Sequence, residues 1–186
     1  PTPQQESPAM TPSAFNFVVP TEMVDLPSKG QYYSEGHPLF NVDAVEIKHM
    51  TAKEEDILSS ETLLKKGLAL DRMIQSILVD KRIKVKDLII GDKNALLIAA
   101  RRFGYGDSYN TRITCPKCQE ELEHAFVLSS LTCKNVEEVE SISRTENNTF
   151  TINLPKSNFS VEFKILTVGE INNIIFGSLE LMKAFT

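Results

Sequence analysis

The spacing of apolar residues changes twice along this chain of 186 residues, and this change limits the fold more than any other sequence feature. Before residue 51 and after residue 106, apolar residues tend to alternate with polar ones, as in half-buried β-strands. Between these points they recur every three or four residues, as on the buried side of an amphipathic helix. Separate strand-rich and helix-rich stretches predict an α+β fold.

The elements of this α+β fold are expected in a fixed order. We expect an N-terminal extended arm and strands, a central cluster of short helices, a zinc-ribbon-like β-hairpin, and a C-terminal hairpin plus helix. The predicted regions are a flexible or partner-bound arm at 1–14, a strand-plus-helical core domain at 15–106, and the two hairpins with the terminal helix at 107–186. The arm is rich in proline and has almost no apolar residue that could pack, so packing cannot offset its ordering entropy.

The strand predictions of the first region depend on two apolar stretches and the turn between them. Residues 15–19 are apolar except Asn16, and Pro20 then interrupts the run, which favours an edge strand or an extended arm. Leu26–Gly30 has the proline and glycine of a turn. Strands are expected at Gln31–Tyr33 and at 42–50, where Val45 and Ile47 alternate with charged residues.

The central region contains sequence signals for the starts and ends of helices. Thr51 and Glu54 have the spacing of a capping box, in which each residue satisfies an amide of the other. A helix is expected from about residue 68 to 78. A further helix should open with Asp92 as its N-cap and stop at Gly104, since glycine often ends helices.

The last region is expected to contain a loop, a hairpin and a helix. Residues 132–147 are polar and acidic and predict a loop-rich segment. Residues 149–154 and 159–166 both alternate, and a turn sequence separates them, which predicts a hairpin. A final helix should start at Thr167.

One group of residues has the chemistry of a metal site. Cys115 and Cys118 lie two residues apart on a turn between predicted strands, a spacing that can hold one side of a tetrahedral zinc ion. The second cysteine pair of a zinc ribbon is missing. Only Cys133 lies at the sequence distance where that pair would be expected, and His124 lies between Cys118 and Cys133. The hairpin could complete a structural zinc site by bringing these two residues to the turn. The alternatives are a metal-free, degenerate ribbon or a redox pair, and the redox pair lacks its usual strand–turn–helix context.

The sequence contains no recognisable catalytic motif. Its three histidines, His37, His49 and His124, lie in unrelated segments and are expected to be surface or hydrogen-bonded residues. The net charge of −5 argues against nucleic acid as the main partner, because phosphate binding needs a basic face. An odd number of cysteines and the lack of a recognisable secretory signal favour a reducing compartment, and no apolar run is long enough to span a membrane. These features predict an interaction protein, not an enzyme, with no cofactor apart from the zinc considered above.

Aromatic residues near the N-terminus are the candidate interface residues. Phe15, Phe17, Tyr32 and Tyr33 are expected to be exposed, beside strand edges that have no partner. Aromatic side chains often anchor interfaces, and open strand edges accept strands of neighbouring proteins. We therefore expect these four residues to contact a partner.

Four segments in succession resemble one known family. They are Leu26-Pro-Ser-Lys-Gly30 followed by Tyr33, Ile47–Leu58, Leu88–Leu97 with Arg101 and Tyr105-Gly106, and Thr114–Cys118. In order and spacing they resemble the baseplate hub subunit family of T-even-type contractile-tailed bacteriophages, over about residues 17–130.

This resemblance implies a structural or assembly role in the central hub of a tail baseplate, with no catalytic residues. The implied protein is made late in infection, assembles in the host cytoplasm and becomes part of the virion tail baseplate. Its implied partners are other baseplate hub and tail proteins, the tape measure protein among them, and it would be oligomeric within the assembly. The alternative function is a zinc-ribbon-like adaptor or regulatory protein that binds nucleic acid.

Overall fold

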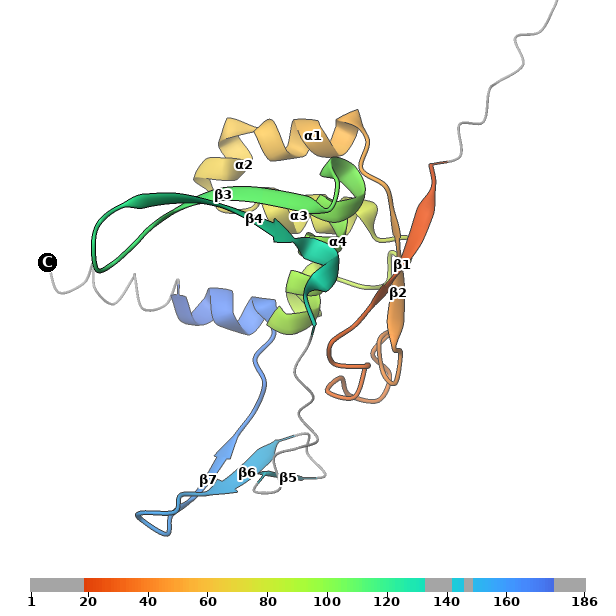
Figure 1. The fold of residues 1–186 in the computed structure, drawn as a ribbon. Helices are drawn as coiled ribbons and strands as arrows, with labels where there is room; N and C mark the ends of the chain where they lie inside the picture. Colours follow the sequence, from red (N-terminus) through yellow and green to blue (C-terminus); the bar gives the residue numbers. More distant parts are fainter. Residues whose placement is uncertain (1–18, 133–141, 146–148, 176–186) are drawn as a thin grey trace, which may run out of the picture.

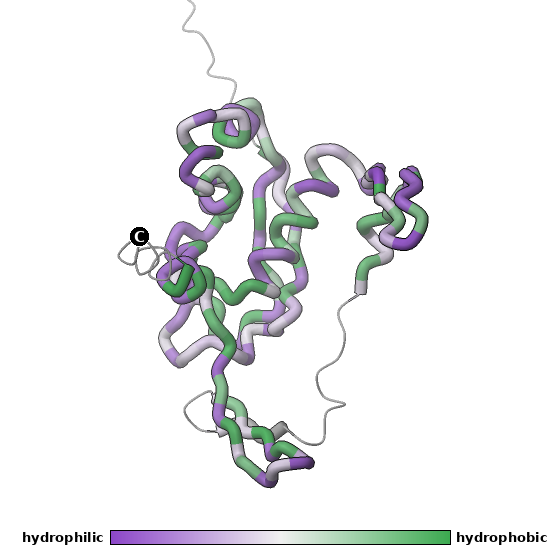
Figure 2. The backbone as a smooth tube through the Cα atoms, turned by 90° about the vertical axis from the view of Figure 1, so that its left-hand side faces the viewer, coloured by the Kyte–Doolittle hydropathy of each residue, from purple (hydrophilic) through white to green (hydrophobic). Residues whose placement is uncertain are grey.

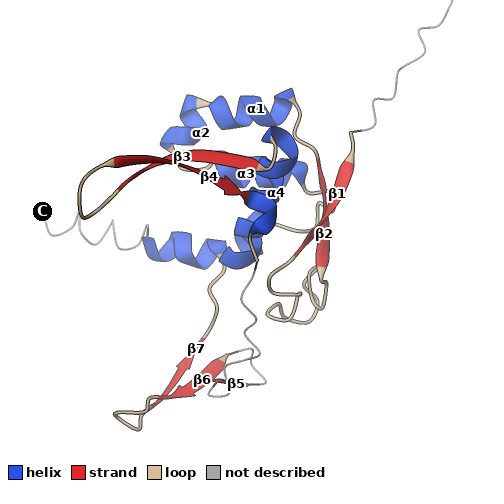
Figure 3. Cartoon of the chain, viewed as in Figure 1, coloured by secondary structure: helices blue, strands red, loops and turns tan. Residues whose placement is uncertain are grey.

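The computed structural model describes residues 19–132, 142–145 and 149–175, which form helices and three small antiparallel sheets (Figures 1 and 3). The first sheet pairs β1 (Thr21–Asp25) with β2 (Ala44–Lys48), and the second pairs β3 (Ser108–Thr114) with β4 (Glu121–Val127). The third has the order β5 (Ile142–Arg144), β6 (Phe150–Asn153), β7 (Ser160–Phe163). The α+β prediction is confirmed.

The helices lie between the first and second sheets in the sequence. They are α1 (Ala52–Ser59), α2 (Glu61–Lys65), α3 (Ala69–Ile77) and α4 (Ile90–Tyr105), with the short 3-10 helix η1 (Val85–Asp87). A second 3-10 helix, η2 (Leu128–Ser130), follows β4. A further helical stretch starts at Val168 and continues to the end of the described residues at 175. No helix in the described part of the chain is long and apolar enough to cross a membrane.

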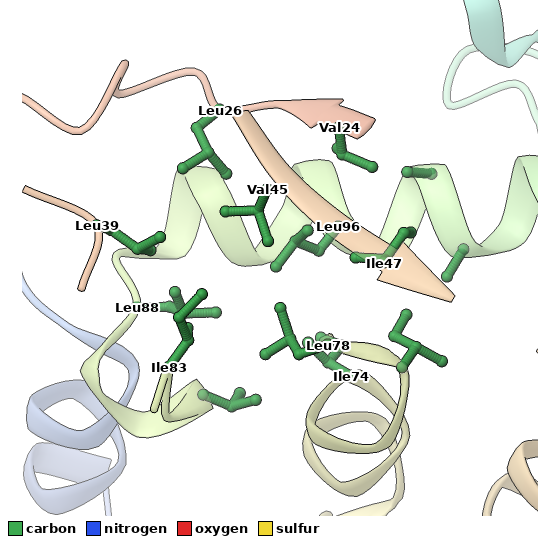
Figure 4. Close-up of a cluster of buried hydrophobic side chains, with 14 of the residues drawn as sticks. Val24, Leu26, Leu39, Val45, Ile47, Ile74, Leu78, Ile83, Leu88 and Leu96 are labelled. Carbon is green, nitrogen blue, oxygen red and sulfur yellow. The ribbon is translucent and has the colours of Figure 1, made fainter. Parts of the chain in front are cut away.

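The core lies between the β1–β2 sheet and helices α3 and α4 (Figure 4). As predicted, Val45 and Ile47 are buried and Glu46 between them is exposed, because successive strand residues face opposite sides. Leu96 of α4 and Ile74 of α3 meet them from the other side. Later parts of the chain also join this core: the amide of Val168 donates to the carbonyl of Leu88 at 2.8 Å, and the Val168 side chain is buried.

The predicted capping box at Thr51 is present, and a second one, which was not predicted, lies at Thr167. The main-chain amide of Thr51 donates to Glu54 Oε2 at 2.9 Å, and α1 begins at the next residue. The amide of Thr167 donates to Glu170 Oε2 at 2.9 Å in the same way, and the final helix begins at Val168. Both predicted helix starts are confirmed, because a local signal of four residues is enough to fix them.

The predicted ends of α4 are wrong. The helix begins at Ile90, so Asp92 is its third residue and not its N-cap. An acidic residue in the first turn of a helix is favoured by the helix dipole and looks like an N-cap in the sequence. The helix also runs past Gly104 to Tyr105, and Gly106, with φ of 87°, ends it.

The segment between β1 and β2 folds as a succession of turns. The prediction of a strand at Gln31–Tyr33 is therefore wrong. Tyr33 is only 5% exposed, so the expectation of an exposed Tyr33 is also wrong. Its hydroxyl donates to Asp92 Oδ2 at 2.7 Å, and its ring stacks on His37 with the centroids 4.5 Å apart. The buried acceptor on α4 draws this ring inward, which no local pattern indicates.

The C-terminal hairpin is confirmed by the pairing of β6 with β7. Strand β5 adds a third strand to this sheet from within the region predicted as loop-rich, so that prediction is wrong for residues 142–144. A three-residue strand has too little alternation to stand out in the sequence.

Candidate functional site

The β3–β4 hairpin is the candidate functional site, because it projects from the core and exposes nearly all of its residues. Figure 2 shows this two-stranded ribbon standing clear of the helical body. Two strands without further cover are marginally stable in water. The prediction of two strands across the Cys115–Cys118 turn is confirmed.

The register of the hairpin places apolar side chains on one face. Residues directly opposite one another share a face, and β3 pairs Tyr109 with Phe126 and Ile113 with Leu122. We call this surface the hairpin apolar face. It consists of Tyr109, Thr111, Ile113, Leu122, His124 and Phe126. Its four large apolar side chains are 39–57% exposed in the chain.

The opposite face of the hairpin is mainly polar. Arg112 Nε and Glu123 Oε1 form a cross-strand ion pair at 3.2 Å, one step along the ladder from Ile113 and Leu122. The hairpin is therefore an amphipathic ribbon without a core beneath its apolar face. Exposed apolar surface rimmed by polar residues marks interaction sites in soluble proteins.

The base of the hairpin is held against the end of α4. The Arg101 guanidinium lies over the rings of Tyr105 and Tyr109, 5.1 and 5.9 Å from their centroids. Asp107 joins the two strands: its carboxylate accepts bonds from the amide of Ser129 at 2.7 Å and from the Ser129 hydroxyl at 2.6 Å. These contacts fix the direction in which the hairpin apolar face points.

The tip of the hairpin carries the two cysteines of the predicted metal site, and both thiols are free. The turn is closed by a bond from the Gln119 amide to the carbonyl of Cys115 at 2.9 Å, and Gln119 has φ of 61°. Main-chain hydrogen bonds from Cys118 and Lys117 lower the pKa of the Cys115 thiol. Amides directed at a sulfur stabilise a thiolate, the form that binds zinc.

The other two predicted ligands do not complete this site in the described residues. His124 pairs with Thr111. This pair lies three steps along the ladder from the Thr114–Glu121 pair that borders the turn, and three steps correspond to about 10 Å. The ring of His124 packs on Phe126, so the hairpin does not bring His124 to the turn in this structure. Cys133 lies outside the described residues, and within the described ones no group of three or more His, Cys, Asp or Glu could hold a metal ion. Structural zinc stays a prediction that rests on Cys115 and Cys118.

Of the aromatic residues predicted as interface anchors, only two can be placed. Phe15 and Phe17 lie outside the described residues. Tyr32 is half-buried, and its ring meets that of Phe150 with the centroids 5.6 Å apart. The sequence analysis did not predict the hairpin apolar face as an interface. Its sequence signal is that Tyr109, Thr111 and Ile113 alternate with more polar residues.

A second exposed apolar surface lies on the third sheet. Phe159, Val161, Phe163 and Ile165 alternate along and beside β7 and are 40–70% exposed. Phe163 also packs on Phe150, with the ring centroids 5.6 Å apart, so this surface continues toward Tyr32. The chain therefore exposes apolar surface on both of its C-terminal sheets.

The comparisons with known proteins give one match. Residues 19–181 match a family described as T4 bacteriophage base plate protein. Neither the curated proteins nor the solved structures gave a match. Since the matched residues make up most of the sequence, the chain belongs to the T4 bacteriophage base plate protein family.

Proposed function

We propose that this protein is a structural subunit of the central hub of the phage tail baseplate, and that the hairpin apolar face binds a neighbouring subunit. Membership of the base plate family makes the protein a phage baseplate structural protein and supports a non-enzymatic role. The narrower assignment to the hub is supported by the resemblance of the four segments described above.

The exposed hairpin apolar face carries this proposal. Covering a fully exposed large apolar side chain contributes roughly 1.5–3 kcal/mol, and the four on this face are about half exposed. Their burial would contribute roughly 3–6 kcal/mol before the cost of association. This is enough for a specific contact within a larger assembly, where each subunit meets several neighbours.

The proposed partners are other hub and tail proteins, the tape measure protein among them. We propose that the subunit becomes part of an oligomeric assembly, which forms in the host cytoplasm late in infection before it joins the contractile tail. The family match does not support the alternative of a zinc-ribbon-like adaptor that binds nucleic acid. The net charge of −5 argues against that alternative as well.

The proposal is tested by changing the hairpin apolar face without changing the core. The double substitution Ile113→Thr and Leu122→Thr removes two facing apolar side chains and puts β-branched residues, which suit a strand, at both positions. We expect this variant to fold and to be lost from purified baseplate assembly intermediates, measured as its ratio to the other subunits by quantitative mass spectrometry.

The matched control is Arg112→Thr with Glu123→Thr, the neighbouring cross-strand pair on the opposite face. An exposed ion pair contributes less than about 1 kcal/mol, so this control should enter the intermediates at the wild-type ratio. Normal incorporation of the Ile113→Thr and Leu122→Thr variant would show that this face is not the contact surface.

A further inference from the structure

A strongly basic hollow lies among the helices that precede α4. It has a volume of about 710 Å³ and is formed by residues of β2, α1, α2, α3 and the segment after α3. Five cationic side chains line it, and together they define what we call the basic hollow: Lys48, Lys53, Arg72, Lys81 and Lys84. They come from four separate parts of the chain, so only the tertiary structure brings them together.

None of these five cations has an ion-pair partner in the part of the chain that the structure describes, and Lys48, Lys53 and Arg72 have no side-chain hydrogen bond there either. Nearby cations are paired. Lys65 meets Glu61 at 3.1 Å, and Lys93 meets Asp71 at 2.5 Å. Although the chain has a net charge of −5, five cations without an ion-pair partner among the described residues thus gather in this hollow.

The remaining two cations are held in position by the main chain. Lys81 Nζ donates to the carbonyls of Ser76 at 3.0 Å and Leu78 at 2.5 Å, where the end of α3 leaves its last carbonyl groups free. Lys84 Nζ donates to the carbonyl of Lys81 at 2.9 Å. Both charges are therefore fixed at the edge of the hollow before any ligand arrives, which lowers the entropic cost of binding.

The electrostatics of the hollow favour an anion. Burial lowers the pKa of Lys81, and the charges of Lys48, Lys53 and Lys84 lower it further. Glu54 acts in the opposite direction, but its carboxylate already accepts bonds from Ser76 and Thr51. An anion placed among these cations would relieve their mutual repulsion.

We propose that the basic hollow binds an acidic segment of another protein through that segment's carboxylates. The hollow also presents Ile57 and Leu63, which suit the apolar side chains of a peptide. A long nucleic acid would extend beyond five clustered cations onto a chain whose net charge is negative. This inference rests on the proposed function in one respect, which is that the ligand is a neighbouring protein of the assembly.

The test uses the whole chain and a fluorescently labelled peptide of ten glutamates, with binding measured by fluorescence anisotropy at low and at physiological salt. In the triple variant Lys48→Gln, Lys53→Gln and Arg72→Gln, we expect at least a tenfold weaker Kd than in the wild type. Lys81 and Lys84 stay unchanged in this variant, because their main-chain bonds support the fold.

The matched control removes the same amount of charge elsewhere, through Lys66→Gln, Lys117→Gln and Lys156→Gln, three exposed lysines outside the hollow. This control should bind the peptide within twofold of the wild type. Equal weakening in both triple variants, or tighter binding of a DNA duplex of 20 base pairs than of the peptide, would overturn the proposal.

The experiment is independent of the hairpin. The Ile113→Thr and Leu122→Thr variant keeps the basic hollow and should bind the peptide as the wild type does. Loss of assembly with normal peptide binding, or the reverse, therefore separates the two proposals.

Discussion

At the residue scale, two buried carboxylates hold the molecule together through hydrogen bonds. Asp92 is fully buried and accepts bonds from the Ser28 amide at 3.0 Å, the Ser28 hydroxyl at 2.6 Å and the Tyr33 hydroxyl. Burial, and then the bond to Asp92, raises the pKa of Tyr33, so this hydroxyl remains a donor. Glu54 plays the same part at the start of α1, where it bonds to Ser76 of α3 at 2.6 Å. A buried charge persists only where such partners surround it.

Glu54 should make stability depend on pH. Burial raises its pKa, but the bonds from Ser76 and Thr51 outweigh burial and hold the pKa at about 2, below the ordinary 4.5. A carboxyl with a lowered folded-state pKa stabilises the fold above its unfolded pKa and loses this contribution as the pH falls. We expect Glu54→Gln to reduce the free energy of unfolding by roughly 2 kcal/mol at pH 7.

This difference between the wild type and Glu54→Gln should shrink as the pH falls from about 4.5 toward 2, measured by urea unfolding at several pH values. Glu61→Gln is the control, because the Glu61 side chain is exposed and paired only with Lys65. It should change stability by less than about 0.5 kcal/mol at any pH. A difference for Glu54→Gln that is constant over this range would contradict the assignment.

At the scale of elements, the succession of turns between β1 and β2 binds the sheet to α4. The Ser28 hydroxyl accepts from the Gly30 amide at 3.0 Å while it donates to Asp92, so the turn and the helix share one network. Gly30 has φ of 69° and lies against the main chain of Leu39 and Val42. This close approach lets the segment fold back on itself and carry Tyr33 into the core.

Two glycines of this segment provide a matched test. A Cβ at Gly30 would lie 2.2 Å from Val42 N and 2.4 Å from Leu39 O, whereas at Gly36 it would meet nothing within 4 Å. Both glycines have positive φ, 69° and 88°. We expect Gly36→Ala to cost about 1 kcal/mol from backbone strain alone.

Gly30→Ala should cost at least about 3 kcal/mol, because the clash involves the main chain and cannot be relieved by a side-chain rotation. Chemical denaturation of the two variants measures the difference. An equal decrease in the free energy of unfolding of both variants would mean that the main chain can move away from Gly30 easily. The segment would then not be packed tightly against the core.

At the scale of the whole molecule, stability and interaction surface are separated. The buried cluster gathers residues of the first sheet, α3, α4 and the start of the last helix, while no residue of the β3–β4 hairpin belongs to it. The second and third sheets instead expose apolar residues side by side, on the hairpin apolar face and along β7. A chain of this kind can change its contact surfaces without losing its core.

Two leucines test this separation with the same substitution. Leu96 is fully buried in α4, whereas Leu122 on the hairpin apolar face is 57% exposed. Leu96→Ala should lower the free energy of unfolding by about 3 kcal/mol, since it leaves a cavity in the core. Leu122→Ala should lower it by less than about 0.5 kcal/mol in the isolated protein. A large loss for Leu122→Ala would show that the hairpin is part of the cooperative core.

Local patterns determined much of this structure in advance. The alternation at Val45 and Ile47 predicted β2, and the capping box of Thr51 and Glu54 predicted the start of α1. The apolar spacing after Thr167 predicted the final helix. The two hairpins followed from alternation around turn residues. Each of these signals acts within a few residues, where backbone sterics and local hydrogen bonds decide the outcome.

Only the tertiary structure decided which residues meet across the chain. Asp92 resembles an N-cap in the sequence but binds Ser28 and Tyr33 from more than fifty positions away, and Tyr33 is buried for the same reason. The five cations of the basic hollow come from four parts of the chain, and the hairpin left its apolar face uncovered. The sequence by itself determined where β2, α1 and the final helix lie, because short-range forces set them. Packing of distant segments decided which polar groups find partners and which surfaces remain open, and the proposed function depends on those surfaces.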